Sequence, residues 1–197
     1  MTRRRADAVQ NRGKLLDAAE AIFVEMGVNA PLDAVAERAG VGRATLFRNF
    51  ADRRALIVAL LDRGLAEIEE EAKQLDGDPG TLARLLRFVA DRVIFRAPLV
   101  EYWQSFDHDS TEFQSALRRF LDIFDKPVEW AVANSACRSD LRPADIILVV
   151  STITGALYER APERRRELAD RAWMFVVDMV QLRGATSLVR RGCRPEP

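Results

Sequence analysis

The chain contains few of the residues and motifs on which enzymes and metal proteins depend. Its 197 residues include two cysteines and one histidine. Cys137 and Cys193 match no spacing used by metal sites or redox pairs, so we expect no metal, no cofactor and a reducing compartment. The sequence also lacks a glycine-rich phosphate loop, an HExxH motif and a GxSxG motif. We therefore expect that the protein is not an enzyme.

The single histidine, His108, lies between Asp107 and Asp109. Residues adjacent in a chain rarely converge on one reacting atom, and metal sites usually collect more than one imidazole or thiolate. A solvated loop is the simplest interpretation of this cluster, and a polar contact to a ligand is the alternative.

Long apolar runs are also missing from the sequence. No stretch is long enough to span a bilayer, and the arginine-containing N-terminus lacks the apolar core of a signal peptide. The composition, 48% hydrophobic and 30% charged, is that of a folded chain with a sizeable core rather than a disordered one. We expect a cytoplasmic protein with no membrane partner.

The net charge is zero, but the charges are unevenly distributed. Residues 1–14 carry five basic side chains and one acidic one, so the rest of the chain is net acidic. A basic N-terminus on an acidic body suits a protein that contacts a polyanion at one end. For Arg3, Arg4 and Arg5 the sequence allows either an ordered DNA contact, such as an arm in the minor groove, or a solvated tail.

The most informative stretch is residues 32–50, LDAVAERAGVGRATLFRNF. Its first half repeats apolar residues at the spacing of a helix with one buried face: Leu32, Val35, Ala36 and Ala39. Gly40 ends this helix, and Gly42 begins a second one that points Leu46 and Phe50 inward and leaves a polar, basic face outside. This is the helix-turn-helix arrangement, in which the second helix lies in the major groove of DNA.

With the helix before it and residues 52–56 after it, this stretch resembles the DNA-binding domain of the TetR/AcrR family of bacterial transcription regulators. The matching residues are Val35-Ala36, Ala39-Gly40-Val41, Thr45-Leu46-Phe47 and Phe50. The specific likeness covers about the first quarter of the chain, and the remainder resembles the family in length and helical character. The sequence departs from the family at Ala30, where a capping Ser or Thr is usual, and at Phe47 and Asn49, where Tyr and His are common.

The second helix of this motif is predicted to contact DNA. Arg43 and Arg48 are suited to phosphate or guanine, and Phe47, which donates no hydrogen bond, is suited to a sugar or a thymine methyl group. The complete predicted set is Arg43, Ala44, Thr45, Phe47, Arg48 and Asn49, with Lys14 and Arg53 on phosphates. An ordinary charged surface on a structural helix pair is the alternative.

The fold class predicted is all-α. A helix rich in apolar residues precedes the motif and stops at Gly27, and Asp52 caps a long helix that ends near Gln74. The sequence DGDPG at residues 76–80 is the clearest domain boundary. We expect a helix-turn-helix domain at 1–51, a connecting helix at 52–75 and a helical ligand-binding and dimerisation domain at 76–197. Further helices are expected at about 81–96, 98–106, 111–135 (kinked or split at Pro127), 144–160 and 164–183.

Aromatic side chains are concentrated in the C-terminal domain. In the resembled family this domain binds a small molecule, and large flat side chains among short helices suit an apolar cavity. The candidate ligand-binding residues are Phe88, Arg92, Phe95, Trp103, Phe106, Phe120 and Phe124. For each aromatic residue, a place in the core is the alternative.

The last two helices are apolar over more than one face, which indicates burial on several sides. A twofold contact between two subunits, as in the resembled family, would provide it. The candidate interface residues are Ile146, Val150, Ile153, Leu157, Trp173, Val176, Val177 and Val180. A single thick monomeric core is the alternative.

These features together predict a homodimeric transcription regulator that binds a palindromic double-stranded DNA operator and a small apolar or aromatic ligand. The resemblance implies a repressor rather than an activator. The main alternative is a helical protein–protein adaptor without sequence-specific DNA binding. A small-molecule enzyme is a third possibility that no set of residues supports.

Overall fold

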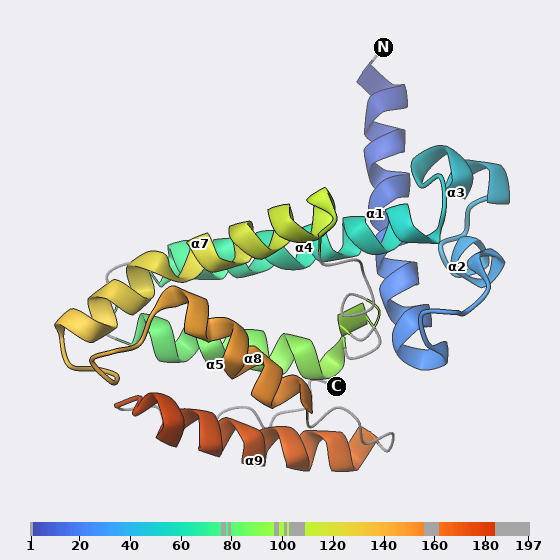
Figure 1. The fold of residues 1–197 in the computed structure, drawn as a ribbon. Helices are drawn as coiled ribbons and strands as arrows, with labels where there is room; N and C mark the ends of the chain where they lie inside the picture. The colour runs from blue at the N-terminus through green and yellow to red at the C-terminus, as the bar shows by residue number, and fades with distance from the viewer. Residues whose placement is uncertain are drawn as a thin grey trace. The chain divides into compact units, whose positions relative to one another are not determined.

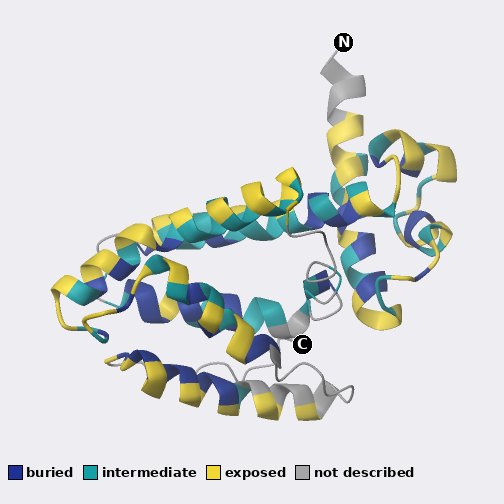
Figure 2. Cartoon of the chain, in the orientation of Figure 1, coloured by how far each residue is buried: buried dark blue, intermediate teal, exposed yellow. Residues whose placement is uncertain are grey.

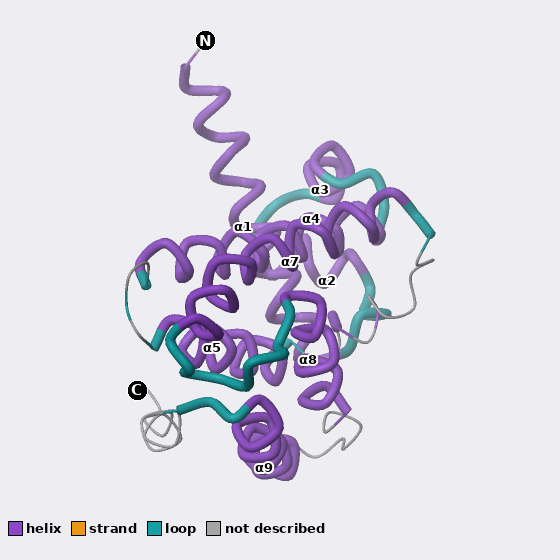
Figure 3. The backbone as a smooth tube through the Cα atoms, turned by 60° about the vertical axis from the view of Figure 1, so that its left-hand side comes forward, coloured by secondary structure: helices purple, strands orange, loops and turns teal. Residues whose placement is uncertain are grey.

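The computed structural model describes residues 2–75, 78, 80–96, 99–100, 102, 109–155 and 162–183. These residues form helices and turns with no strand among them, which confirms the all-α prediction (Figures 1 and 3). No helix in this described part of the chain is both long enough and apolar enough to cross a membrane.

The first four helices are α1 (Thr2–Met26), α2 (Leu32–Arg38), α3 (Arg43–Asn49) and α4 (Arg53–Gln74). α1 ends at Gly27, which has φ +83° and donates its N–H to the carbonyl of Phe23 at 3.0 Å. Gly40, after α2, has φ +65°. Both stops were predicted, and both need the left-handed backbone that glycine adopts without strain.

The starts of α2 and α4 differ in how they are capped. Pro31 is the N-cap of α2 and gives no side-chain hydrogen bond. At α4 the Asp52 carboxylate accepts a hydrogen bond from the N–H of Ala55 at 2.7 Å, as the sequence predicted. The weaker start therefore lies at the first helix of the helix-turn-helix pair.

The remaining helices are α5 (Thr81–Phe95), α7 (Thr111–Ala133), the short 3-10 helix η1 (Pro143–Asp145), α8 (Ile146–Gly155) and α9 (Pro162–Val180). α7 continues through Pro127, so of the two predicted outcomes, a kink or a split, the split is wrong. Burial of Phe124 and Val128 on either side holds the helix together despite the missing hydrogen bond. Most of the helix expected at 98–106, and residues 156–160, lie outside the described residues.

The chain divides into two compact units. The N-terminal unit contains residues 1–64 and 96–107, and the C-terminal unit contains residues 65–95 and 108–197. The division falls inside α4, between Gly64 and Leu65, and the segment after α5 returns to the N-terminal unit.

Each unit has its own apolar core, which lies among the buried helix faces in Figure 2. In the N-terminal unit, fully buried Phe23, Leu46 and Leu56 bring α1, α3 and α4 together. In the C-terminal unit, Leu85, Phe124 and Trp173 join α5, α7 and α9 in the same way. The helix-turn-helix pair is thus fixed by packing against α1 and α4.

Candidate DNA-binding surface and ligand region

The turn between α2 and α3 sets the orientation of α3. The Val41 N–H donates to the carbonyl of Ala36 at 3.0 Å, and the Leu46 N–H donates to that of Gly42 at 3.2 Å. Leu46 is the buried residue of α3, and Phe50 follows it into the core with 2% exposure. The rest of this two-turn helix is left for solvent or a partner.

Arg43 and Phe47 lie together on the exposed side of α3. The Arg43 guanidinium forms an ion pair of 2.9 Å with Asp33 of α2, and its central carbon lies 5.5 Å from the centroid of the Phe47 ring. Both partners of the ion pair are well exposed, so the pair contributes at most about 1 kcal/mol. A DNA phosphate can therefore replace Asp33 at little cost.

Thr45 organises the other polar side chains of α3. Its hydroxyl accepts a hydrogen bond from Arg48 at 2.8 Å, and its backbone carbonyl accepts one from the Asn49 amide at 2.8 Å. One Asn49 donor is therefore already used within the helix, while the exposed Arg48 is directed by its contact with the Thr45 hydroxyl. Ala44 is exposed on the same helix.

The two residues predicted on phosphates have different surroundings. Lys14 of α1 is exposed. Arg53 is half-buried, and its guanidinium donates to the carbonyls of Val28 and Ala30, the latter at 2.7 Å, with its central carbon 5.8 Å from the Phe23 ring centroid. Arg53 thus braces the turn between α1 and α2, where backbone carbonyls need donors.

Arg12 is a candidate that the sequence prediction omitted. Its guanidinium carbon lies 4.5 Å from the centroid of the Phe50 ring, and it donates to the carbonyl of Asn49 at 3.5 Å. It lies three residues before the buried Leu15, on the same face of α1, and its contacts with Phe50 and Asn49 place it beside the end of α3. The side chains of Arg3, Arg4 and Arg5 lie outside the described residues.

Four predicted ligand residues form two pairs, one on α5 and one on α7. Phe124 is fully buried, its ring centroid is 5.1 Å from that of Phe120, and the Arg92 guanidinium lies 4.6 Å from the Phe88 centroid and 2.8 Å from Glu67. Phe124 belongs to the C-terminal core, and Phe88 and Phe120 pack against it. The side chain of Phe95 and residues Trp103 and Phe106 lie outside the described residues.

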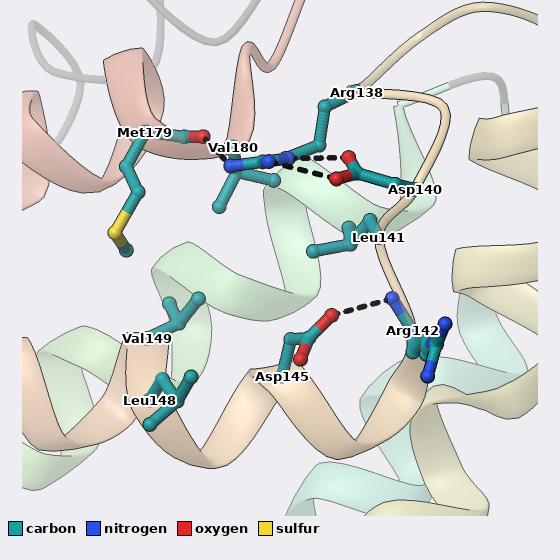
Figure 4. Close-up of a pocket in the computed structure, with 9 residues that line it drawn as sticks. All are labelled: Arg138, Asp140, Leu141, Arg142, Asp145, Leu148, Val149, Met179 and Val180. Atoms are coloured by element: carbon teal, nitrogen blue, oxygen red, sulfur yellow. Dashed lines mark hydrogen bonds and ion pairs between the residues drawn. The ribbon is translucent and has the colours of Figure 1, made fainter.

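Two pockets are lined by described residues of the C-terminal unit, and none of these four residues lines either one. The first, of about 350 Å³, lies between the loop after α7, the start of α8 and the end of α9 (Figure 4). The Arg138 guanidinium binds both Asp140 oxygens at 2.6 and 2.9 Å and lowers the pKa of that carboxyl. The second pocket, of about 760 Å³, is lined by Trp130 and polar residues of α7, with the ends of α4 and α5.

Most of the predicted interface residues lie inside the single subunit rather than on its surface. Ile146, Ile153, Trp173, Val176, Val177 and Val180 are buried in the core of the single subunit, Val150 is half-buried against it, and Leu157 lies outside the described residues. The apolar stripe of α8 and α9 packs against the subunit's own α5 instead. The large apolar side chains left exposed on these two helices are Leu148, Leu168, Met174, Phe175 and Met179.

A short exposed helix, held by a turn on a small helical core, defines a helix-turn-helix protein. Residues 15–60 match the family model of bacterial regulatory proteins, tetR family. The solved TetR regulator SCO0520 of Streptomyces coelicolor shares 25% identity over 88% of this chain and 99% of its own, with a TM-score of 0.65. Residues 15–60 therefore match the TetR family, and the fold is similar to that of a solved TetR regulator, as the resemblance predicted.

Curated relatives are named as transcription regulators. The HTH-type transcriptional activator FasR of Mycolicibacterium smegmatis is 30% identical over 53% of this chain and 44% of its own length. The HTH-type transcriptional regulator TtgR of Pseudomonas putida is 25% identical over 92% of this chain and 89% of its own. The chain spans 44% of the length of FasR and less than half of the length of two other curated relatives.

Proposed function

We propose that this protein is a transcription regulator that binds an operator in double-stranded DNA through α3. The observation that carries the proposal is the exposed polar surface of α3, with Arg43 and Arg48 on a helix whose opposite side is anchored by Leu46. A helix of this kind enters the major groove, where arginine side chains pair with guanine or with phosphates.

The individual contacts follow from the surroundings of each side chain. Arg48 is the proposed base contact, because its guanidinium is exposed and directed by Thr45. Arg43 exchanges Asp33 for a phosphate, and Lys14 contacts a phosphate from α1. Phe47, 39% exposed and without a donor, packs against a sugar or a thymine methyl group.

The operator is bound by two copies of the chain. The exposed apolar side chains of α8 and α9, chiefly Leu148, Phe175 and Met179, form the surface that a second copy would cover. A twofold axis then presents two copies of α3 to successive major grooves of a palindrome. Residues 1–51 serve as the DNA-binding domain, 52–75 as the connecting helix and 76–197 as the ligand-binding and dimerisation domain.

We further propose repression relieved by a small apolar or aromatic ligand in the C-terminal unit. Of the fold neighbours, SmeT is the repressor of a multidrug efflux pump, and two others are gamma-butyrolactone receptors. A ligand shifts DNA binding only as far as its affinity differs between the two conformations of the dimer. The protein would act in the cytoplasm, where bacterial DNA lies, and without catalysis.

The test is binding of the purified protein to DNA from upstream of its own gene, compared with unrelated DNA of equal length at physiological salt. Specific recognition is expected to be tighter by roughly a thousandfold. Arg48→Ala is expected to weaken the specific complex by about 1–3 kcal/mol, or roughly 5- to 150-fold. Arg84→Ala, an exposed arginine of α5, is the matched control and should leave binding unchanged.

Binding of the operator candidate needs to be distinguished from incidental attraction to a basic surface. Equal affinity for both DNAs, left unchanged by Arg48→Ala, would favour the protein–protein adaptor over the regulator. Equal affinity that Arg48→Ala weakens would place the operator elsewhere in the genome, and fragments from other promoters would then be screened.

A further inference from the structure

Glu20 of α1 lies in a half-buried cluster of charged residues. Its carboxylate accepts hydrogen bonds from Arg63 of α4 and from Arg96, which follows α5. Arg63 also forms an ion pair of 2.6 Å with Asp17. The side chains of Glu20, Arg63 and Arg96 are 25%, 25% and 15% exposed, so water screens these contacts less than those of a surface pair.

Arg63 and Arg96 lie next to two of the points where the chain passes from one unit to the other. Arg63 directly precedes the passage at Gly64–Leu65, and Arg96 directly follows the passage at Phe95–Arg96. A third passage, after Asp107, lies outside the described residues. The Glu20 carboxylate therefore binds an arginine beside two of the three points where the chain crosses between the units. Both arginines lie on the side of the N-terminal unit.

Two further observations show that this arrangement is a packed one. A side-chain carbon at Gly64 would lie 3.3 Å from an Arg96 guanidinium nitrogen, so the glycine leaves room for Arg96 beside α4. Three residues after Arg96, Leu99 is 3% exposed in the N-terminal core, and its N–H donates to the Arg96 carbonyl at 2.9 Å. The segment that arrives from α5 is thus fixed by a charge and by an apolar anchor.

We propose that Glu20 is a positioning residue that restricts the orientations of the DNA-binding unit relative to the C-terminal unit. Its effect is mechanical: with both connections fixed to α1, a change at the end of α5 is transmitted to the unit that carries α3. Without the carboxylate charge, the segment that begins at Arg96 moves more freely against α1, whereas Arg63 keeps its ion pair with Asp17 and α4 stays continuous. DNA binding must then order the unit at an entropic cost. The effect on DNA rests on the proposed function, whereas the restriction of orientation does not.

The test compares two isosteric variants. Glu20→Gln removes the charge that holds both arginines. Glu25→Gln is the matched control, because Glu25 lies on the same helix and binds both guanidinium nitrogens of Arg38, at 3.1 and 2.8 Å, away from either passage. Arg96→Gln removes the guanidinium that Glu20 binds after α5. This variant is used in place of Glu20→Gln if Glu20→Gln does not fold.

The direct measurement needs neither ligand nor DNA. Spin labels are placed in the full chain at Glu37→Cys on α2 and Asp125→Cys on α7, both exposed, with Cys137 and Cys193 changed to alanine. Pulsed dipolar spectroscopy on subunits diluted with unlabelled chain then gives the distribution of distances between the two labels. We expect Glu20→Gln and Arg96→Gln to broaden this distribution by about twofold, and Glu25→Gln to leave it unchanged. An unchanged width in both Glu20→Gln and Arg96→Gln would overturn the proposal.

A second measurement connects orientation with DNA. Glu20→Gln is expected to weaken operator binding roughly tenfold. It should also lose less affinity than the unsubstituted protein when about two base pairs are inserted between the half-sites. A variant that is merely less stable would show no such change in spacing tolerance. One outcome is that neither the unsubstituted protein nor the variants bind DNA specifically, while Glu20→Gln still broadens the distribution of distances between the labels. In that case the proposed function fails and the positioning role of Glu20 stands.

Discussion

Replacing Arg53 by alanine separates two roles that this residue could have. The sequence predicted a phosphate contact, whereas the structure has the guanidinium donating to the carbonyls of Val28 and Ala30 and lying 5.8 Å from the Phe23 ring centroid. If these contacts are the main role of Arg53, the substitution destabilises the N-terminal unit before it affects DNA binding.

The expected magnitude follows from the contacts that are lost. Two hydrogen bonds from a charged donor to half-buried carbonyls contribute about 1 kcal/mol each, because water replaces part of what is lost. The distant contact with the Phe23 ring adds at most about 0.5 kcal/mol. A total of about 2 kcal/mol corresponds to a fall of roughly 10 °C in the melting temperature of a domain of this size.

The assay is thermal unfolding followed by circular dichroism, together with DNA affinity measured over a range of salt concentrations. Arg53→Ala should lower the melting temperature and leave the slope of log K against log salt unchanged. Arg54→Ala, at the adjacent exposed position, serves as the control for a lost surface charge. An unchanged melting temperature with a slope reduced by about one unit would refute the brace and support a phosphate contact.

Two further predictions concern the C-terminal unit. Phe175→Asp should weaken a dimer roughly a thousandfold in sedimentation equilibrium, because two exposed aromatic side chains worth about 2 kcal/mol each lose their partner. Glu69→Gln should lower the melting temperature at pH 7 and have little effect near pH 3. The Arg119 guanidinium, 2.5 and 2.9 Å from the Glu69 oxygens, lowers the pKa of that carboxyl, so the stability it provides is present above the ordinary carboxyl pKa, about 4.3, and is lost as the pH falls through the folded-state value.

Each of these predictions has a matched control. Val24→Asp changes an exposed apolar residue of α1, 45% accessible, and should leave the oligomeric state unchanged. A dimer unaffected by Phe175→Asp would show that the subunits meet elsewhere. Glu70→Gln removes a neighbouring carboxylate whose ion pair with Lys73 is a loose 3.8 Å. An equal loss of stability at pH 3 and pH 7 in Glu69→Gln would contradict the assignment of its effect to the ionised carboxylate.

Several features were predictable because they depend on residues close together in the chain. Gly27 and Gly40 end their helices through a backbone conformation that glycine adopts freely, and Asp52 begins α4 through a hydrogen bond three residues away. Leu46 and Phe50 face the core because of helical spacing. The sequence by itself therefore determined the helix-turn-helix motif, the all-α fold and the likeness of residues 15–60 to the TetR family.

Other features depend on residues far apart in the chain, and only the tertiary structure decided them. An arginine can donate to a phosphate or to a carbonyl equally well. In the folded chain Arg53 lies beside Val28 and donates to its carbonyl in the turn between α1 and α2. An apolar helix can pack against its own subunit or a second copy, and α5 covers Trp173 while Phe175 stays exposed. Glu20 meets Arg96 across 76 residues of sequence. No local periodicity encodes such contacts, because they arise from the way whole helices pack in space.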